Sequence, residues 1–429
     1  MTSRPGELAR RLGTGDAVVI GLSSMIGAGV FAVFGPAADA AGAGLLAGLA
    51  VAAFVAYCNA VSSAQLAAAY PVSGGTYVYG RERLGHWWGF VAGWGFVVGK
   101  TASCAAMALT FASYAVPGPD WLRRGVALVA VIALAALNYR GVTRTVTAAR
   151  ILVTCTLLAL AVFVAAMLGS GTADAGHLAE WRPGGPAGAY GILQAAGLLF
   201  FAFAGYARMA TMGEEVRDPA TTLPRAIPLA LLVAVGVYAV VAVAALLVAG
   251  PDGLAGTASP LAAAAGTAGV PAVEPVVRVG AALAALGALL ALMAGVGRTA
   301  LAMARERDLP HRLAAIHPRT HVPHRAEVAL AAVVGALVVS TDLRHAIGFS
   351  SFGVLVYYAV ANVAAFTQPA DQRRWPRALN VLGLLGCLGL AATLPRTAVL
   401  TGLAVFAVGL VVRAVTLTVR RRRPGAPRK

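Results

Sequence analysis

The chain has 429 residues, of which 59% are hydrophobic and only 12% are charged, and its mean hydropathy is +0.78. This composition excludes an ordinary soluble protein, whose surface needs more polar side chains, and is typical of a polytopic membrane protein. The net charge of +17 does not indicate nucleic-acid binding, because the basic residues gather in short loops between apolar runs, where they signal membrane orientation.

Twelve apolar segments are long enough to cross ~30 Å of hydrocarbon, although 124–139 and 327–341 are marginal. The predicted fold is therefore an all-α polytopic membrane protein with about twelve transmembrane helices. The predicted spans are 15–37, 42–68, 86–115, 124–139, 149–169, 188–212, 226–250, 274–303, 327–341, 345–367, 377–394 and 397–418.

The first span contains a helix with a weak centre, Gly21–Phe31. Gly27 and Gly29 lower its helical propensity, and Ser23 and Ser24 offer side-chain oxygens to backbone groups freed by a break. Unpaired backbone at membrane depth is tolerated only where it is buried in protein or lines a cavity. The segment is therefore a candidate binding site; the alternative is that its small residues allow close helix packing.

The connections between the spans predict the orientation. With the N-terminus inside, most basic residues fall on the cytoplasmic side, including the arginines from Arg298 to Arg325 and the C-terminal cluster, so both termini are predicted to be cytoplasmic. The segment Pro71–Arg83 mixes aromatic and basic residues and is predicted to form a short helix at the interface. The loop histidines His311, His317, His321 and His324 lack the spacing of a metal site, and the four scattered cysteines imply no disulfide framework.

A second weak helix, Phe200–Arg208, lies in the sixth span, five spans after the first. Interrupted spans at matching positions of two five-span halves are typical of inverted-repeat transporters.

Four blocks, in this order along the chain, resemble the amino acid–polyamine–organocation (APC) superfamily of permeases, amino acid permease type. The blocks are Gly21–Phe31, Pro71–Tyr77, Phe200–Pro219 with Pro224–Ile227, and Arg298–Arg305 with Leu309, Pro310 and His317–Arg319 beyond it. The resemblance implies a 5+5 inverted repeat with interrupted first and sixth helices. The implied parts are a cytoplasmic arm (1–14), a ten-helix core (15–367, with halves of about 15–169 and 188–367), two additional transmembrane helices (377–418) and a basic cytoplasmic tail (419–429).

The resemblance also implies a substrate site between the interrupted spans. The carboxylate of an amino acid would meet backbone N–H groups near Ser24 to Gly29, and its amino group would meet carbonyl groups of both breaks. Glu215 would belong to a cytoplasmic gate, with Arg217 or loop arginines as partners. The implied substrate-binding residues are Ser23, Ser24, Met25, Ile26, Gly27, Ala28 and Gly29 in the first span and Phe203, Ala204, Gly205 and Tyr206 in the sixth, where ordinary packing is the alternative for the two aromatic residues.

Lys100 lies near the middle of the third span of a chain with 32 arginines and only two lysines. Lysine can lose its proton when buried, whereas arginine effectively cannot, and a charge inside the membrane is usually functional. We predict that Lys100 titrates during transport, either coupling it to protons or replacing a coupling cation with a fixed charge; the alternative is a structural ammonium bound to carbonyl groups. Some proton-coupled members of the superfamily carry a lysine in the fifth span, where this chain reads Ile151–Thr156, so that site cannot be transferred.

Arg208, about one turn beyond the second break, is predicted either to contact the substrate carboxylate or to snorkel and pair at the gate. Together, Lys100 and Arg208 disfavour a dicationic substrate. The stretch Gly287–Met293 of the eighth span, expected to face the first span, has no Ser or Thr, which disfavours a sodium site.

The predicted function is secondary active transport of neutral or acidic amino acids across the cell membrane by alternating access, coupled to protons, without a cofactor, a metal or a nucleic-acid partner. An amino acid or amine exchanger of the same fold and a non-transporting amino acid sensor are the alternatives. A membrane enzyme is disfavoured, because His86, His177 and His345 are isolated and the sequence has no nucleotide-binding loop. The exact substrate, the oligomeric state, and the choice among uniport, symport and exchange stay open.

Overall fold

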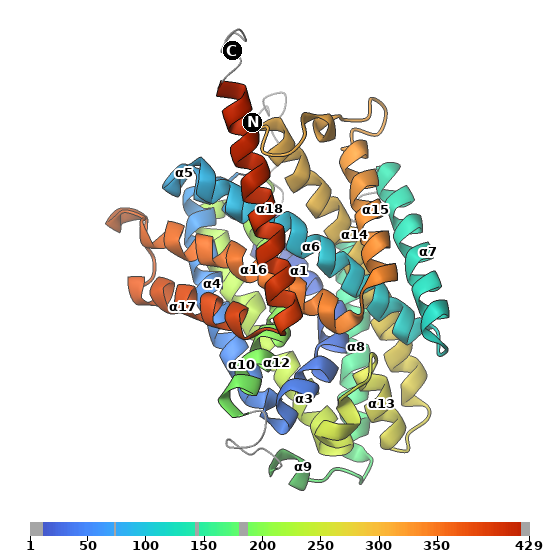
Figure 1. Ribbon diagram of the computed structural model, residues 1–429. Coiled ribbons are helices and arrows are strands. Elements are labelled where there is room, and N and C mark those ends of the chain that lie inside the picture. Colours follow the sequence, from blue (N-terminus) through green and yellow to red (C-terminus); the bar gives the residue numbers. More distant parts are fainter. Residues whose placement is uncertain (1–11, 73, 142–145, 180–187, 422–429) are drawn as a thin grey trace.

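The computed structural model describes residues 12–72, 74–141, 146–179 and 188–421, so most of the predicted arm and tail lies outside the described residues. Within these ranges the chain is a bundle of helices without strands, and one isolated bridge pairs Leu12 with Val216. The prediction of an all-α polytopic membrane protein is confirmed (Figure 1).

Each predicted span coincides with a helix or with a chain of short helices. The spans other than the first and sixth are α4 (Leu45–Ala69), α6 (His86–Ala115), α7 (Asp120–Tyr139), α8 (Val146–Gly169), α12 (Pro219–Leu254), α14 (Val273–Arg305), α15 (His324–Ser340), α16 (Leu343–Phe366), α17 (Arg377–Thr393) and α18 (Arg396–Arg421). Of these, α12 has a kink at Gly250, near its end. Shorter elements connect them: η1 (Gly42–Gly44), α5 (Thr76–Leu84), α9 (Gly176–Ala179), α13 (Pro260–Thr267), η3 (His311–Ala314) and η4 (Ala370–Gln372). Because α5 begins within Pro71–Arg83, the short helix predicted there is present.

Nine helical stretches of the described chain are long and apolar enough to cross a membrane. The spans formed by α7, α15 and α17 are not among them. Two of these three are the segments that the sequence marks as marginal.

The first and sixth spans are both interrupted. The first consists of α1 (Thr14–Met25), α2 (Ala28–Ala32) and α3 (Phe34–Ala41), and the sixth consists of α10 (Gly188–Phe203), η2 (Ala204–Tyr206) and α11 (Ala207–Ala210). This pattern of breaks agrees with the 5+5 inverted repeat, while the repeat itself stays a prediction.

Helix α6 runs through the bundle and packs against α14, α15 and α16 (Figure 1). Small residues permit this close packing: a Cβ atom on Gly353 of α16 would lie 2.8 Å from the Cα atom of Gly99 on α6. Where lipid is as apolar as leucine, such close contact of small residues is what holds helices together. The packing places Lys100, the residue after Gly99, inside the bundle.

Ion pairs tie the helices together at the end of the bundle where α18 terminates. Arg81 of α5 pairs with Glu306 at 2.6 Å, and Asp308 pairs with Arg413 of α18 at 2.5 Å. The hydroxyl of Tyr77 donates to Asp308 at 2.9 Å, and burial, together with the nearby carboxylate, raises the pKa of Tyr77 far above its usual value. The hydroxyl therefore remains a donor, and α5 stays joined to the loop after α14.

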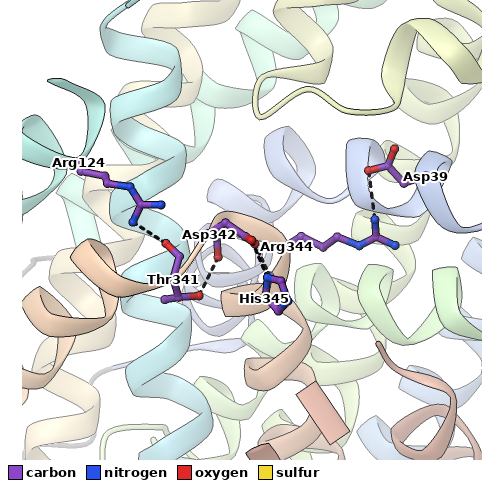
Figure 2. A network of polar contacts seen from close by, with 6 residues as sticks. All are labelled: Asp39, Arg124, Thr341, Asp342, Arg344 and His345. Atoms are coloured by element: carbon purple, nitrogen blue, oxygen red, sulfur yellow. Dashed lines mark hydrogen bonds and ion pairs between the residues drawn. The ribbon is translucent and has the colours of Figure 1, made fainter. Parts of the chain in front are cut away.

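A second polar network lies toward the opposite end and is drawn in Figure 2. The Nη1 atom of Arg124 on α7 lies 2.8 Å from each of the carbonyl oxygens of Val338, Val339 and Thr341 at the end of α15, so its two N–H groups are shared among three acceptors. Figure 2 draws the bond to Thr341. Arg344 at the start of α16 reaches Asp39 of α3 at 3.6 Å. The network connects the interrupted first span to the spans at the far end of the chain.

Candidate functional site

The break in the first span covers Ile26 and Gly27, whose backbone leaves the helical region with ψ angles of 59° and −136°. The N–H groups of these residues turn back to the carbonyl groups of Leu22 (2.7 Å) and Met25 (2.8 Å). Helix α2 restarts at Ala28, and all residues from Met25 to Ala32 are buried. The site predicted at Gly21–Phe31 is therefore a local loss of helix inside the protein.

Ser23 and Ser24 do not bind backbone groups of the break itself. Both hydroxyls donate to the carbonyl group of Ile20, at 3.0 and 2.9 Å, in the preceding turn of α1. This is the usual back-bonding of serine in a helix, and it leaves the serine oxygens free to accept. The predicted hydrogen bonds from these serines to backbone groups freed by the break are not seen.

The sixth span is interrupted differently, because it tightens into the 3₁₀ turn η2 instead of unwinding. The two interruptions touch: a Cβ atom on Gly205 would lie 2.2 Å from the carbonyl oxygen of Ser24 and 2.6 Å from the nitrogen of Met25. One turn away, a Cβ atom on Gly29 would lie 2.7 Å from the Cα atom of Ala202. The structure thus brings together two segments that are about 180 residues apart in the sequence.

Tyr238 of α12 lies behind this contact and was not predicted as a site residue. Its hydroxyl is 2.6 Å from the carbonyl oxygen of Met25 and 3.0 Å from that of Ala202, so it can donate to either one. These carbonyl groups belong to the ends of α1 and α10, where helical partners run out. The signal that sequence reasoning missed is a single tyrosine within a long aliphatic span.

Lys100 reaches the same place from α6. Its ammonium group donates to the carbonyl oxygen of Ala204, the first residue of η2, at 3.0 Å, and the side chain is 6% exposed. Among the described residues it forms no ion pair with a carboxylate. Lys100 therefore places a buried cation on a carbonyl group at the end of α10, where the helix dipole favours positive charge.

The two predicted aromatic site residues lie deeper in the packing. Phe203 packs on Tyr238 with ring centroids 5.0 Å apart, Tyr206 packs on Tyr358 at 4.9 Å, and all four side chains are buried. Both rings therefore pack against aromatic side chains of other helices, and their role in substrate binding stays a prediction.

Arg208 lies on α11, with a guanidinium nitrogen 3.9 Å from the place that a Cβ atom on Gly295 of α14 would occupy. The charges that act on it are those of Arg298, which repels it, and Glu215, which attracts it. In the described chain Glu215 forms no ion pair with Arg217. The backbone of both residues instead binds Leu12, whose N–H donates to Glu215 at 3.1 Å and whose carbonyl accepts from Arg217 at 2.8 Å.

The eighth span faces the first break, as the sequence predicts. A Cβ atom on Gly27 would lie 2.9 Å from the methyl carbon of Ala288 on α14. This part of α14, Gly287–Met293, carries no hydroxyl side chain. Among the described residues there is no cluster of three or more His, Cys, Asp or Glu that could hold a metal ion.

An apolar cavity of about 370 Å³ lies outside this region, between α6, α14, α15, α16 and α18. Its lining includes Trp94, Val98, Ala300, Leu330 and Val405 and none of the predicted substrate-binding residues. The contact between the two breaks, together with Lys100, Arg208 and Glu215 around it, is therefore the candidate site.

Comparison with known proteins places this geometry in a family. The sequence model of the family described as amino acid permease matches residues 12–421. An uncharacterized transporter of Mycobacterium tuberculosis is 59% identical over 97% of this chain and 94% of its own length. The branched-chain amino acid permease BcaP of Bacillus subtilis is 29% identical over 96% of this chain and 94% of its own length. A chloroplastic cationic amino acid transporter of Arabidopsis thaliana is 28% identical over 97% and 78%. The chain therefore belongs to the amino acid permease family.

Proposed function

We propose that this protein is a secondary active transporter of neutral or acidic amino acids that works by alternating access in the cell membrane, with both termini cytoplasmic and with protons as the coupling ion. The observation that carries the proposal is the contact between the interrupted first and sixth spans, with the ammonium group of Lys100 bound at the carbonyl of Ala204. The substrate carboxylate would bind at the start of α2, and its amino group would bind carbonyl groups of the breaks.

The charge around the breaks supports the substrate class. Lys100 and Arg208 add two positive charges near the proposed site, and Glu215 is the carboxylate whose charge acts on Arg208. Lys100 and Arg208 would repel a cationic side chain, whereas they would not repel a neutral or acidic one. The similarity to a branched-chain amino acid permease supports the same choice, although other relatives are named for cationic substrates.

The geometry also favours one of the two roles predicted for Lys100. Its ammonium group donates to a carbonyl oxygen at the end of α10, a position that suits a bound cation. The part of α14 that faces the first span offers no hydroxyl ligand for sodium. Lys100 would therefore act as a tethered cation that holds the break of the sixth span in shape. A lysine in this role removes the need for a sodium ion.

The test is transport by purified protein in liposomes. Counterflow of labelled leucine, alanine and glutamate should show which class is carried, and an imposed inside-alkaline gradient should drive accumulation that a sodium gradient does not. Lys100→Met should lose transport, while Lys429→Met, at the only other lysine, should not. If Lys100→Met kept the full rate and pH dependence, the role of the ammonium group would be refuted. Binding without counterflow in the native protein would instead identify a sensor.

A further inference from the structure

A buried carboxyl group lies inside the bundle, outside the site described above. Glu327 belongs to the first turn of α15, where its N–H donates to the carbonyl group of Pro323 at 3.0 Å. Its side chain is only 3% exposed, and its Oε2 atom has no hydrogen-bond partner among the described residues. An ionisable group in this condition is costly inside a membrane protein and is usually functional.

The carboxyl group is pressed against the backbone of α14. A Cβ atom on Gly297 would lie 2.4 Å from its Oε1 atom and 3.1 Å from its Cδ atom, so the absence of a side chain at position 297 makes room for it. The carboxyl end of Glu327 therefore fills space that a side chain at position 297 would occupy, and this flexible end would have to shift if alanine replaced the glycine.

Arg298 is the cation that acts on Glu327, since its charge favours the ionised carboxylate. The two do not form an ion pair in this structure, and Arg298 is exposed whereas Glu327 is buried. Asn138 on α7 is a second polar neighbour, whose side-chain hydrogen bond also favours the ionised carboxylate, and its amide donates to the carbonyl group of Leu290 at 3.3 Å. Several elements packed against α15 carry titratable or charged groups: His86, Lys100, Cys104 and Tyr114 on α6, Glu274, Arg278, Arg298 and Arg305 on α14, Asp120, Arg123, Arg124 and Tyr139 on α7, and His311 and Arg312 on η3, besides His324 and Arg325 on α15 itself.

This arrangement offers the carboxyl group two states with different partners. Ionised, it needs Arg298 beside it, because an unpaired carboxylate in a dry interior is unfavourable by several kcal/mol. Protonated, it is neutral and can stay buried while Arg298 faces water. The structure as it stands, with a buried acid and an exposed arginine, fits the protonated state.

Electrostatic interactions connect the protonation state of Glu327 to the proposed substrate site. Arg298 repels Arg208, which lies three residues after Gly205 on the sixth span. On α6, the thiol of Cys104 lies in the fields of both Glu327 and Lys100. A movement of Arg298 toward Glu327 would therefore change the electrostatic environment of both cations near the breaks.

We propose that Glu327 carries the coupling proton, ionised when Arg298 pairs with it and protonated when Arg298 turns away. The proton comes from water on one side of the membrane, is held on the carboxyl group, and returns to water on the other side. The inference rests on the proposed function, since it names the group behind the proton coupling proposed there.

A purely structural role gives a different expectation. An acidic residue in the first turn stabilises its helix through the dipole, and this contribution does not depend on transport. Glu274 provides the matched control, because it also occupies the first turn of a long helix, α14, and pairs with Arg278 at 2.8 Å near the outside of the bundle.

The experiment compares the native protein with Glu327→Gln and Glu274→Gln in liposomes. Counterflow at equal pH on both sides requires no net proton movement, whereas accumulation against a gradient does. With one proton per neutral substrate, a gradient of one pH unit can drive about tenfold accumulation, since 1.4 kcal/mol corresponds to a factor of ten. Glu327→Gln should keep counterflow, reduce the accumulation ratio to about one, and abolish substrate-induced proton uptake measured with an internal pH dye; Glu274→Gln should behave as the native protein.

Each outcome decides the question. If Glu327→Gln accumulates substrate like the native protein, or loses counterflow while remaining folded, the proposal is overturned. If it does not fold, Glu327→Asp keeps a carboxyl group on a shorter stem and should shift the pH profile of accumulation; an unchanged profile overturns the proposal. If the native protein performs counterflow but shows no pH-driven accumulation, the proton coupling of the proposed function fails first, and this result is distinct from any difference between variants.

Discussion

The contact between the two interrupted spans can be tested with one methyl group. In Gly205→Ala the added Cβ atom would lie 2.2 Å from the carbonyl oxygen of Ser24 and 2.4 Å from its carbonyl carbon. Ordinary van der Waals contact begins near 3.4 Å, so the two breaks would have to separate by about 1 Å. The obstructing atoms are backbone, which cannot rotate away as a flexible side chain does.

The expected cost follows from that geometry. Overpacking by one carbon typically destabilises a protein by about 1–3 kcal/mol, and a 1 Å displacement at a functional site can lower a rate by roughly 10²-fold. Gly205→Ala should therefore unfold at a lower temperature in detergent and lose most of its amino acid counterflow. Gly236→Ala in α12 is the control, because nothing lies within 4 Å of its new methyl group and alanine is favoured in a helix by about 0.5–1 kcal/mol. Native counterflow and melting temperature in Gly205→Ala would refute the close contact.

Two further predictions concern hydrogen bonds seen only in the folded chain. Tyr238→Phe should lower the melting temperature and weaken substrate binding, because the carbonyl groups of Met25 and Ala202 lose a buried donor. The loss of such a hydrogen bond costs about 1–3 kcal/mol of stability. Tyr190→Phe, at an exposed tyrosine, should change neither property, and equal effects of the two substitutions would contradict the argument. Asp342→Ala should cost about 1 kcal/mol near neutral pH, since its side chain accepts from the N–H of His345 at 2.8 Å as the cap of α16 (Figure 2). Burial alone would raise the pKa of Asp342, but the bonds from His345 outweigh it and hold the pKa below its ordinary 3.8. The pKa of Asp342 is lower in the folded than in the unfolded protein, so the stabilisation is complete above pH 3.8 and is lost as the pH falls through the folded-state pKa. The melting temperatures of the native protein and Asp342→Ala should therefore converge at low pH. A difference that stays constant with pH would contradict the assignment.

The predicted spans agree closely with the helices because both depend on local composition. An apolar run long enough to cross a bilayer must form a helix to satisfy its own backbone, whatever its neighbours are. The weak centres at Gly27 and Gly205 could be found for the same reason, since glycine and small residues lower helical propensity wherever they stand. The hydrogen-bond partners of the side chains near the break were less predictable. Ser23 and Ser24 bind the carbonyl group of Ile20, in the turn before the break.

Contacts between distant parts of the chain were decided by the tertiary structure. Periodicity and composition describe one helix at a time, so they contain no information on which carbonyl group Lys100 would meet or on the hydroxyl of Tyr238 between two helix ends. Glu327 shows the limit most clearly: in the sequence it is an ordinary acidic residue beside a basic loop. Only the packing of α15 against Gly297 buries its carboxyl group and separates it from Arg298, because burial is a property of the assembled bundle and not of a segment.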